Sequence, residues 1–157
     1  MKKIPTTQIS SFHDLILNDR YNDALQISSS LINSYPEDPQ SFILHGIGHN
    51  QLNEFDKALE CFEKSRDLGC SQKEYFSNLS SLNTRKGNFH YNNNEFNKAL
   101  KFFLKATDYA SVNLPGNYSN IGNCYSKLGQ LDKAESNYKK ALKINPKFII
   151  NHINLAN

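Results

Sequence analysis

A seven-residue segment that occurs twice constrains this chain more than any other feature of its sequence. Residues 53–59 read Asn-Glu-Phe-Asp-Lys-Ala-Leu, and residues 94–100 read Asn-Glu-Phe-Asn-Lys-Ala-Leu. Chance seldom places two such similar segments in 157 residues. The recurrence predicts an array of repeats, in which each unit buries its apolar face against its neighbours.

Small residues mark the second helix of each predicted repeat. An alanine at this position lets two helices approach closely, and an aromatic residue four positions later fills the space between repeats. The alanines are Ala24, Ala58, Ala99 and Ala134, which are 34, 41 and 35 residues apart, and the aromatic residues are Phe62, Phe103 and Tyr138. Pro36, Pro146 and Gly69 are expected to end second helices, and Pro115 suits a first helical turn.

The last repeat carries the pattern of a known family. Its large, small and aromatic residues are Tyr118, Ile121, Gly122, Tyr125, Gly129, Ala134, Tyr138, Ala141 and Pro146. In this pattern the chain resembles the tetratricopeptide repeat (TPR) family. The resemblance implies an all-α fold, a right-handed α-solenoid of antiparallel helix pairs whose first helices line a concave groove. We expect one domain over residues 1–157, with repeats at 5–38, 39–71, 72–114 and 115–148 and a partial repeat at 149–157.

The spacing of 41 residues between Ala58 and Ala99 exceeds the family period by seven. Seven residues are close to two helical turns, so that a longer helix keeps its inward and outward faces to within about 20°. The spacing therefore predicts a long first helix from Gln72 to Tyr91. The alternative is a kink or short loop near Lys86-Gly87, where glycine weakens a helix.

The resemblance implies that a peptide or partner protein binds in the groove. The groove-facing residues would include Asn78, Arg85, Asn88, Tyr91, Asn92, Asn120, Asn123, Lys127 and Asn154. A carboxamide both donates and accepts hydrogen bonds, so a series of asparagines can bind a peptide backbone without reading its sequence. The alternative is that an asparagine-rich composition places asparagine there without a function.

The last repeat also resembles the TPR arm of protein O-GlcNAc transferases, in which a ladder of groove asparagines holds substrate chains. Only Asn78, Asn120 and Asn154 match the ladder position. Two functions remain open. The first is a module that binds a peptide or partner protein; the alternative is the substrate-recruiting arm of a larger enzyme, such as a glycosyltransferase, with its catalytic domain after residue 157.

His45 and His49 are four residues apart, a spacing that can bind a metal ion on one face of a helix. The sequence around them places no glutamate or cysteine to complete a ligand set, so we expect both to be packing residues that form a hydrogen bond to a neighbouring helix. No nucleophile with a base, phosphate loop or redox pair appears. We therefore expect no intrinsic active site, no metal and no cofactor.

Charge and hydropathy exclude other partners. A net charge of +3 without a dense Lys/Arg stripe makes nucleic acid a poor partner. No apolar run reaches the roughly 18 to 20 residues of a membrane span, so a cytoplasmic protein is expected. The three cysteines form no CxxC pair and are expected to be reduced. Residues 148–157 are unusually apolar for the end of a repeat array, which predicts either a longer protein or self-association through this last helix.

Overall fold

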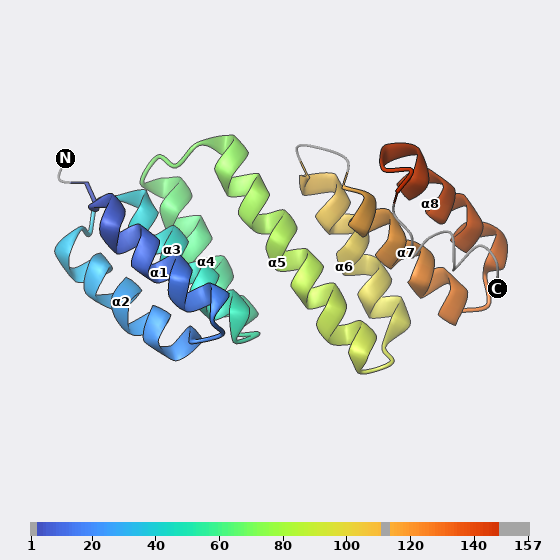
Figure 1. The fold of residues 1–157 in the computed structure, drawn as a ribbon, viewed down its shortest axis with the longest axis horizontal. Helices are drawn as coiled ribbons and strands as arrows, with labels where there is room; N and C mark the ends of the chain where they lie inside the picture. Colours follow the sequence, from blue (N-terminus) through green and yellow to red (C-terminus); the bar gives the residue numbers. More distant parts are fainter. Residues whose placement is uncertain (1–2, 111–113, 148–157) are drawn as a thin grey trace. The chain divides into compact units, whose positions relative to one another are not determined.

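The computed structural model describes residues 3–110 and 114–147, and these residues form helices connected by short turns (Figure 1). The helices are α1 (Thr6–Leu17), α2 (Tyr21–Ser34), α3 (Pro39–Gln51), α4 (Phe55–Asp67), α5 (Gln72–Asn92), α6 (Phe96–Tyr109), α7 (Pro115–Lys127) and α8 (Leu131–Ile144). Each predicted repeat of residues 5–38, 39–71, 72–114 and 115–148 contains one helix pair. The predicted partial repeat at 149–157 lies outside the described residues.

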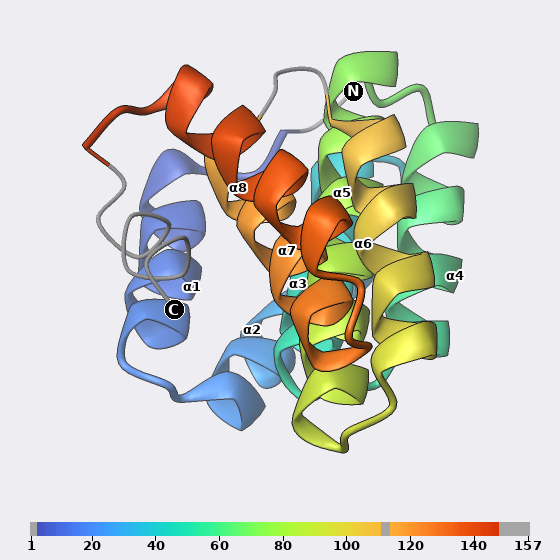
Figure 2. The ribbon, with the colours of Figure 1, turned by 90° about the vertical axis from the view of Figure 1, so that its right-hand side faces the viewer.

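The helices pack as antiparallel pairs. Helix α1 contacts α2, α3 contacts α4, and α7 runs beside α8 both in Figure 1 and in the end view of Figure 2. Successive pairs also contact each other, α2 with α3 and α6 with α7. The predicted all-α solenoid of stacked helix pairs is therefore confirmed. None of the described helices combines the length and apolar character needed to cross a membrane.

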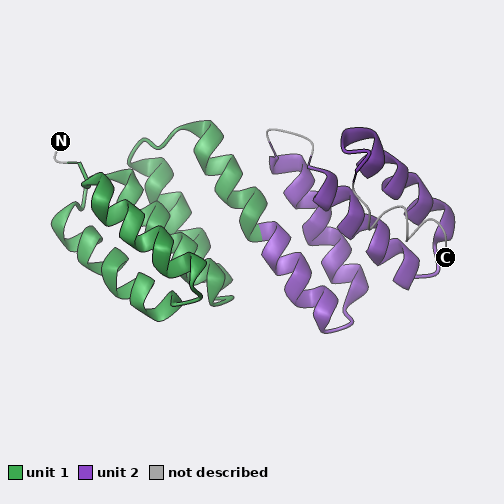
Figure 3. Ribbon diagram, in the orientation of Figure 1, with its two compact units in different colours: residues 1–82 green, residues 83–157 purple. Residues whose placement is uncertain are grey.

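The chain forms two compact units, residues 1–82 and residues 83–157, whose boundary falls inside α5 (Figure 3). The core of unit 1 contains Ile4, Phe12, Ala24, Leu31, Tyr35 and Leu44. The core of unit 2 contains Ala99, Phe103, Ile121 and Cys124. The prediction of one domain over residues 1–157 stays a prediction.

The turn within every helix pair has the same backbone. Its second residue has a positive φ, at 57° in Asp19, 61° in Asn53, 60° in Asn94 and 72° in Gly129. The N–H of the next residue donates to a carbonyl five positions earlier, as from Glu54 to His49 at 3.0 Å. This hydrogen bond is the one that defines the Schellman motif at a helix C-terminus. Asparagine and aspartate tolerate the left-handed conformation better than most residues, which explains their use there.

Helix α5 runs unbroken from Gln72 to Asn92. The predicted long first helix is confirmed, and the loop near Lys86-Gly87 that was the alternative is wrong. Glycine is required at position 87 of this helix because the ring of Phe103 on α6 occupies the space that a side chain would need. A Cβ atom added at Gly87 would lie 2.5 Å from that ring.

The predicted helix ends agree with the structure. Helix α2 stops two residues before Pro36, α8 stops two residues before Pro146, and Gly69 follows α4 with a φ of 89°. Pro115 is the first residue of α7. These residues end or start helices through their own backbone geometry, so the local sequence was sufficient to place them.

Candidate functional site

Two rows of polar side chains occupy equivalent faces of the first helices α5 and α7 in unit 2. Each row has the spacing i, i+3, i+7, which puts its members on one face of a helix. The α5 row is Arg85, Asn88 and Asn92, and the α7 row is Asn120, Asn123 and Lys127. We call these six residues the first-helix surface.

The two rows are equivalent because both helices pack on their partners in the same way. Gly87 precedes Asn88 and lies against the ring of Phe103, and Gly122 precedes Asn123 and lies against the ring of Tyr138. A Cβ atom at either glycine would lie 2.5 Å from a ring carbon. In addition, Thr84 Oγ1 of α5 lies 3.5 Å from Asn117 Oδ1 of α7, so the two first helices are neighbours.

The side chains of the first-helix surface differ in their exposure and in the hydrogen bonds that they form within the protein. Asn88, Asn92 and Lys127 are exposed, and Asn120 is half-buried. Among the described residues, these four side chains have no hydrogen bond or ion pair. Asn123 differs, because its Oδ1 accepts a hydrogen bond of 2.9 Å from the hydroxyl of Tyr138 on α8.

The remaining predicted groove residues lie elsewhere. Tyr91 packs against the core of unit 2 and meets the ring of Phe96 edge-on at 5.3 Å, and burial raises its pKa. Asn78 belongs to the part of α5 in unit 1, where its Nδ2 is buried without a hydrogen-bond partner among the described residues. Asn154 lies outside the described residues. The candidate binding surface therefore consists of the unit 2 residues alone.

One residue of this region was missed by the sequence reasoning. Asn117 of α7 is 3% exposed, and its Nδ2 is a buried donor with no acceptor among the described atoms. It stands next to the first-helix surface through its contact with Thr84. Its place in the first turn after Pro115 gave no signal, because burial there depends on how α7 meets α5.

A second polar feature joins the end of a first helix to the start of its partner. In unit 1, His49 Nδ1 lies 2.5 Å from Glu54 Oε2, and Lys57 Nζ lies 3.0 Å from Glu54 Oε1. The same arrangement recurs in unit 2 with His90, Glu95 and Lys98. We call each trio a clasp. The last pair keeps its lysine, which donates from Lys133 to Gln130 at 2.8 Å, but has Tyr125 in place of the histidine.

The clasps favour the charged form of their carboxylates. The hydrogen bond from His49 and then that from Lys57 lower the pKa of Glu54, and those from Lys98 and then His90 lower the pKa of Glu95. Both carboxylates are partly exposed, so these are modest contributions at the protein surface.

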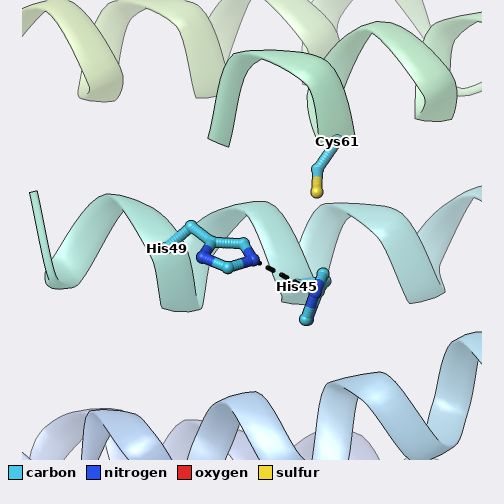
Figure 4. Close-up of side chains that lie close together, drawn as sticks. All are labelled: His45, His49 and Cys61. Atoms are coloured by element: carbon cyan, nitrogen blue, oxygen red, sulfur yellow. Dashed lines mark hydrogen bonds between the residues drawn. The ribbon is translucent and has the colours of Figure 1, made fainter. Parts of the chain in front are cut away.

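The clasp of unit 1 leads into a half-buried polar cluster that the clasp of unit 2 lacks. His45 and His49 approach each other through their Nε2 atoms, which are 3.1 Å apart, and Cys61 of α4 points toward them (Figure 4). His45 Nδ1 lies 2.9 Å from Ser28 Oγ on α2. Burial lowers the pKa of His45 to about 4 and raises the pKa of the Cys61 thiol to about 11.

The hydrogen bond between His45 and Ser28 of α2 agrees with the prediction that these histidines pack with a hydrogen bond to a neighbouring helix. The sequence indicated no cysteine near them, because Cys61 is on the partner helix and no fixed spacing connects it to His45. Gly46 supplies the close approach. A Cβ atom there would lie 2.6 Å from the ring of Phe62 and 3.1 Å from Cys61 Cβ.

Comparison with known proteins agrees with this architecture. Tetratricopeptide repeat models match residues 80–113 and residues 118–148. Tetratricopeptide repeat protein 16 from Mus musculus is 29% identical over 139 residues, which are 84% of this chain and 18% of the relative. Its Homo sapiens counterpart is 28% identical over 136 residues, 84% of this chain and 16% of the relative. The chain thus spans less than a fifth of the length of these curated relatives.

Solved structures share the fold. MamA residues 41 to the end from Desulfovibrio magneticus RS-1 superposes with a TM-score of 0.62 at 20% identity, covering 96% of this chain and 80% of that one. Another crystal structure of MamA gives a TM-score of 0.57 at 19% identity, covering 92% and 80%. The chain therefore shares with these solved structures the fold of stacked helix pairs. Within it, residues 80–113 and 118–148 resemble tetratricopeptide repeats.

Proposed function

We propose that this chain is a protein-interaction module that binds an extended peptide or a segment of a partner protein on the first-helix surface of unit 2. The observation that carries the proposal is the set of carboxamides on two neighbouring first helices, Asn88, Asn92 and Asn120, which no described residue engages. Repeat solenoids generally use such extended surfaces for binding.

The chemistry of the surface fits a peptide backbone. An extended chain advances about 3.3 to 3.6 Å per residue and presents N–H and C=O groups that need partners once water is removed. Each carboxamide can donate to a carbonyl and accept from an N–H. Since these contacts do not depend on side chains, we expect broad recognition of extended segments with a weak sequence preference.

Substituting the unengaged asparagines tests this proposal. Asn88→Ala and Asn120→Ala should each weaken binding of a peptide selected from a random display library by about 5- to 10-fold, because each removes hydrogen bonds worth about 1 kcal/mol. Asn97→Ala is the matched control, since Asn97 is an exposed asparagine on the second helix α6. Fluorescence anisotropy with the labelled peptide measures the dissociation constants of the wild type and the three variants.

The outcome has a clear opposite. If Asn97→Ala weakens binding as much as the two first-helix variants do, or if no variant changes it, the binding surface is elsewhere. Titration followed by amide NMR gives an independent view, with the largest shifts expected on α5 and α7. Shifts confined to α6 and α8 would contradict the proposal.

The alternative function, a recruiting arm of a larger enzyme, requires a catalytic domain, and the described residues do not form one. The relatives reported above are named for their repeats or as MamA, and no observation favours a transferase. The asparagine ladder suggested by the resemblance to O-GlcNAc transferase arms stays a prediction, because its positions lie in unit 1 at Asn78, in unit 2 at Asn120 and outside the described residues at Asn154.

A further inference from the structure

We propose that His45, His49 and Cys61 of unit 1 bind a zinc ion between α3 and α4. The proposal is independent of peptide binding, which involves unit 2. Each of the three residues offers one ligand atom, and these atoms all lie within 4.8 Å of one another (Figure 4). Two imidazoles and a thiolate are ligands that zinc prefers in proteins.

The hydrogen bonds around the histidines leave the correct nitrogen atoms for a metal. His49 Nδ1 lies 2.5 Å from the Glu54 carboxylate, and His45 Nδ1 lies 2.9 Å from Ser28 Oγ. In metal sites, a ligating histidine donates its second ring N–H to a carboxylate, a backbone carbonyl or a water molecule. Here a carboxylate takes that role for His49 and the hydroxyl of Ser28 takes it for His45. The two Nε2 atoms consequently face each other and the thiol of Cys61.

The distances are close to those of a tetrahedral zinc site. Zinc–nitrogen bonds of about 2.0 to 2.1 Å place two ligating nitrogens about 3.3 Å apart, and a zinc–sulfur bond of about 2.3 Å places nitrogen and sulfur about 3.6 Å apart. The Nε2 atoms of His45 and His49 are 3.1 Å apart. Side-chain rotations that move the sulfur and the two rings by about 1 Å would bring the three ligand atoms to bonding distance, and a water molecule would take the fourth position.

Zinc can displace a proton from the cluster while both histidine ring N–H groups keep a hydrogen-bond acceptor. When zinc binds, the Cys61 thiol proton is released to solvent, and both Nε2 atoms carry lone pairs toward the metal. His45 then holds its proton on Nδ1 and donates to Ser28 Oγ, whose hydroxyl donates to the carbonyl of Leu25 at 3.1 Å. His49 keeps its proton on Nδ1 and donates to Glu54.

The other repeats show that this cluster is not a requirement of the fold. At the positions of His45, His49 and Cys61, the third repeat has Lys86, His90 and Phe102, and the fourth has Ile121, Tyr125 and Asn137. In the third repeat, His90 stacks on Phe102 at 5.1 Å, and Lys86 lies over the same ring at 5.3 Å. The histidine of the unit 2 clasp therefore packs against an aromatic ring. Among the three repeats compared, the one in unit 1 has a second imidazole and a thiol at these positions.

Cobalt substitution tests the site directly in the untagged full chain. We expect one Co²⁺ per chain, with the thiolate-to-metal charge-transfer band and the intense visible bands of tetrahedral coordination, and displacement of the cobalt by Zn²⁺. Cys61→Ser should abolish the charge-transfer band and weaken zinc binding at least 10-fold. Cys70→Ser should change neither, because Cys70 lies outside the cluster.

A second measurement does not depend on spectra. Zinc should slow alkylation of Cys61 by iodoacetamide, read by peptide mass spectrometry, and leave alkylation of Cys70 unchanged. Glu54→Gln should weaken zinc binding about 10-fold or more by loosening His49, as loss of such outer partners generally does. Glu95→Gln in the other clasp is the matched control and should leave zinc affinity unchanged.

Several results would overturn the proposal. These are the absence of zinc binding to the folded wild-type chain, equal zinc affinity in wild type and in folded Cys61→Ser, and equal protection of Cys61 and Cys70. Circular dichroism establishes that each variant is folded, so that a loss of binding by Cys61→Ser is assigned to the missing ligand.

Discussion

At the scale of single residues, Glu54 and Glu95 each hold two helices together at their shared turn. The backbone N–H of the glutamate donates to the carbonyl of the preceding histidine, at 3.0 Å for Glu54 and 2.9 Å for Glu95. The side chain of the same glutamate accepts from the histidine ring and from a lysine one turn later. One residue thereby links the last turn of a first helix with the first turn of the second.

We expect Glu95→Gln to lower the free energy of unfolding at neutral pH. The folded-state pKa of Glu95 lies below the unfolded value of about 4.5, so the stabilisation is present above that value and is lost as pH falls through the folded pKa. The difference between wild type and Glu95→Gln should therefore shrink on acidification. Urea unfolding at a series of pH values measures it, and a difference that does not change with pH would contradict the charged clasp.

The left-handed turn residues give a second prediction at this scale. Asn94 adopts a φ of 60°, which costs glycine less than any residue with a Cβ. Asn94→Gly should stabilise the protein slightly, by a few tenths of a kcal/mol, whereas Gly129→Ala at the equivalent turn should destabilise it by about 1 kcal/mol. Thermal or urea unfolding compares the two. A stabilising Gly129→Ala would show that the turn backbone is not as described.

At the scale of elements, the first helices α3, α5 and α7 each pack on their partner through a glycine. Gly46, Gly87 and Gly122 face the aromatic rings of Phe62, Phe103 and Tyr138, and an added Cβ would come within 2.6 Å or less of a ring carbon. These rings are fully buried or nearly so, and cannot move aside freely. The glycine therefore determines how closely the two helices of a pair approach.

Adding a methyl group at this contact should be unfavourable. We expect Gly87→Ala to destabilise the protein by about 1 to 3 kcal/mol, as overpacking outweighs the gain in helix propensity of about 1 kcal/mol. Gly116→Ala is the control, because a Cβ atom added at Gly116 would have nothing within 4 Å and no clash opposes the substitution. If both variants change the urea midpoint in the same direction, close packing at Gly87 is not what limits the side chain.

The continuity of α5 gives another prediction. Ser81 is exposed in the middle of this helix, so Ser81→Pro disrupts the backbone without removing a buried side chain. It should cost about 3 kcal/mol, because proline lacks the N–H and clashes with the preceding turn. Ser81→Ala should be neutral or mildly stabilising. Equal stability of the two variants in urea would indicate that the helix is interrupted near this position.

At the scale of the whole molecule, charge limits which partners can bind. With a net charge of +3, the chain should not bind duplex DNA appreciably at physiological ionic strength. Anisotropy with a labelled duplex at two salt concentrations measures this, using a peptide ligand as the positive control. Saturable DNA binding that falls steeply with salt would contradict the prediction and would indicate that lysine side chains bind the phosphates.

Much of the architecture could be predicted from the sequence because it depends on short-range chemistry. Small residues followed four positions later by aromatic residues, prolines after second helices and Gly69 after α4 each act within a few residues of their own position. Even the seven additional residues of the third repeat could be interpreted, since two extra helical turns preserve the faces of α5. The paired helices and their approximate limits followed from these signals.

The sites depend on distances between helices, and those were decided by tertiary packing. Cys61 lies beside His45 because Gly46 lets α4 approach α3, and no spacing along the chain records that approach. The sequence pattern predicts Asn123 as a groove residue, but its side-chain oxygen accepts a hydrogen bond from Tyr138. The pattern does not indicate Asn117, whose side chain is buried beside α5. Sequence periodicity specifies which face of a helix is apolar; only the packed structure specifies which side chains meet across the contact.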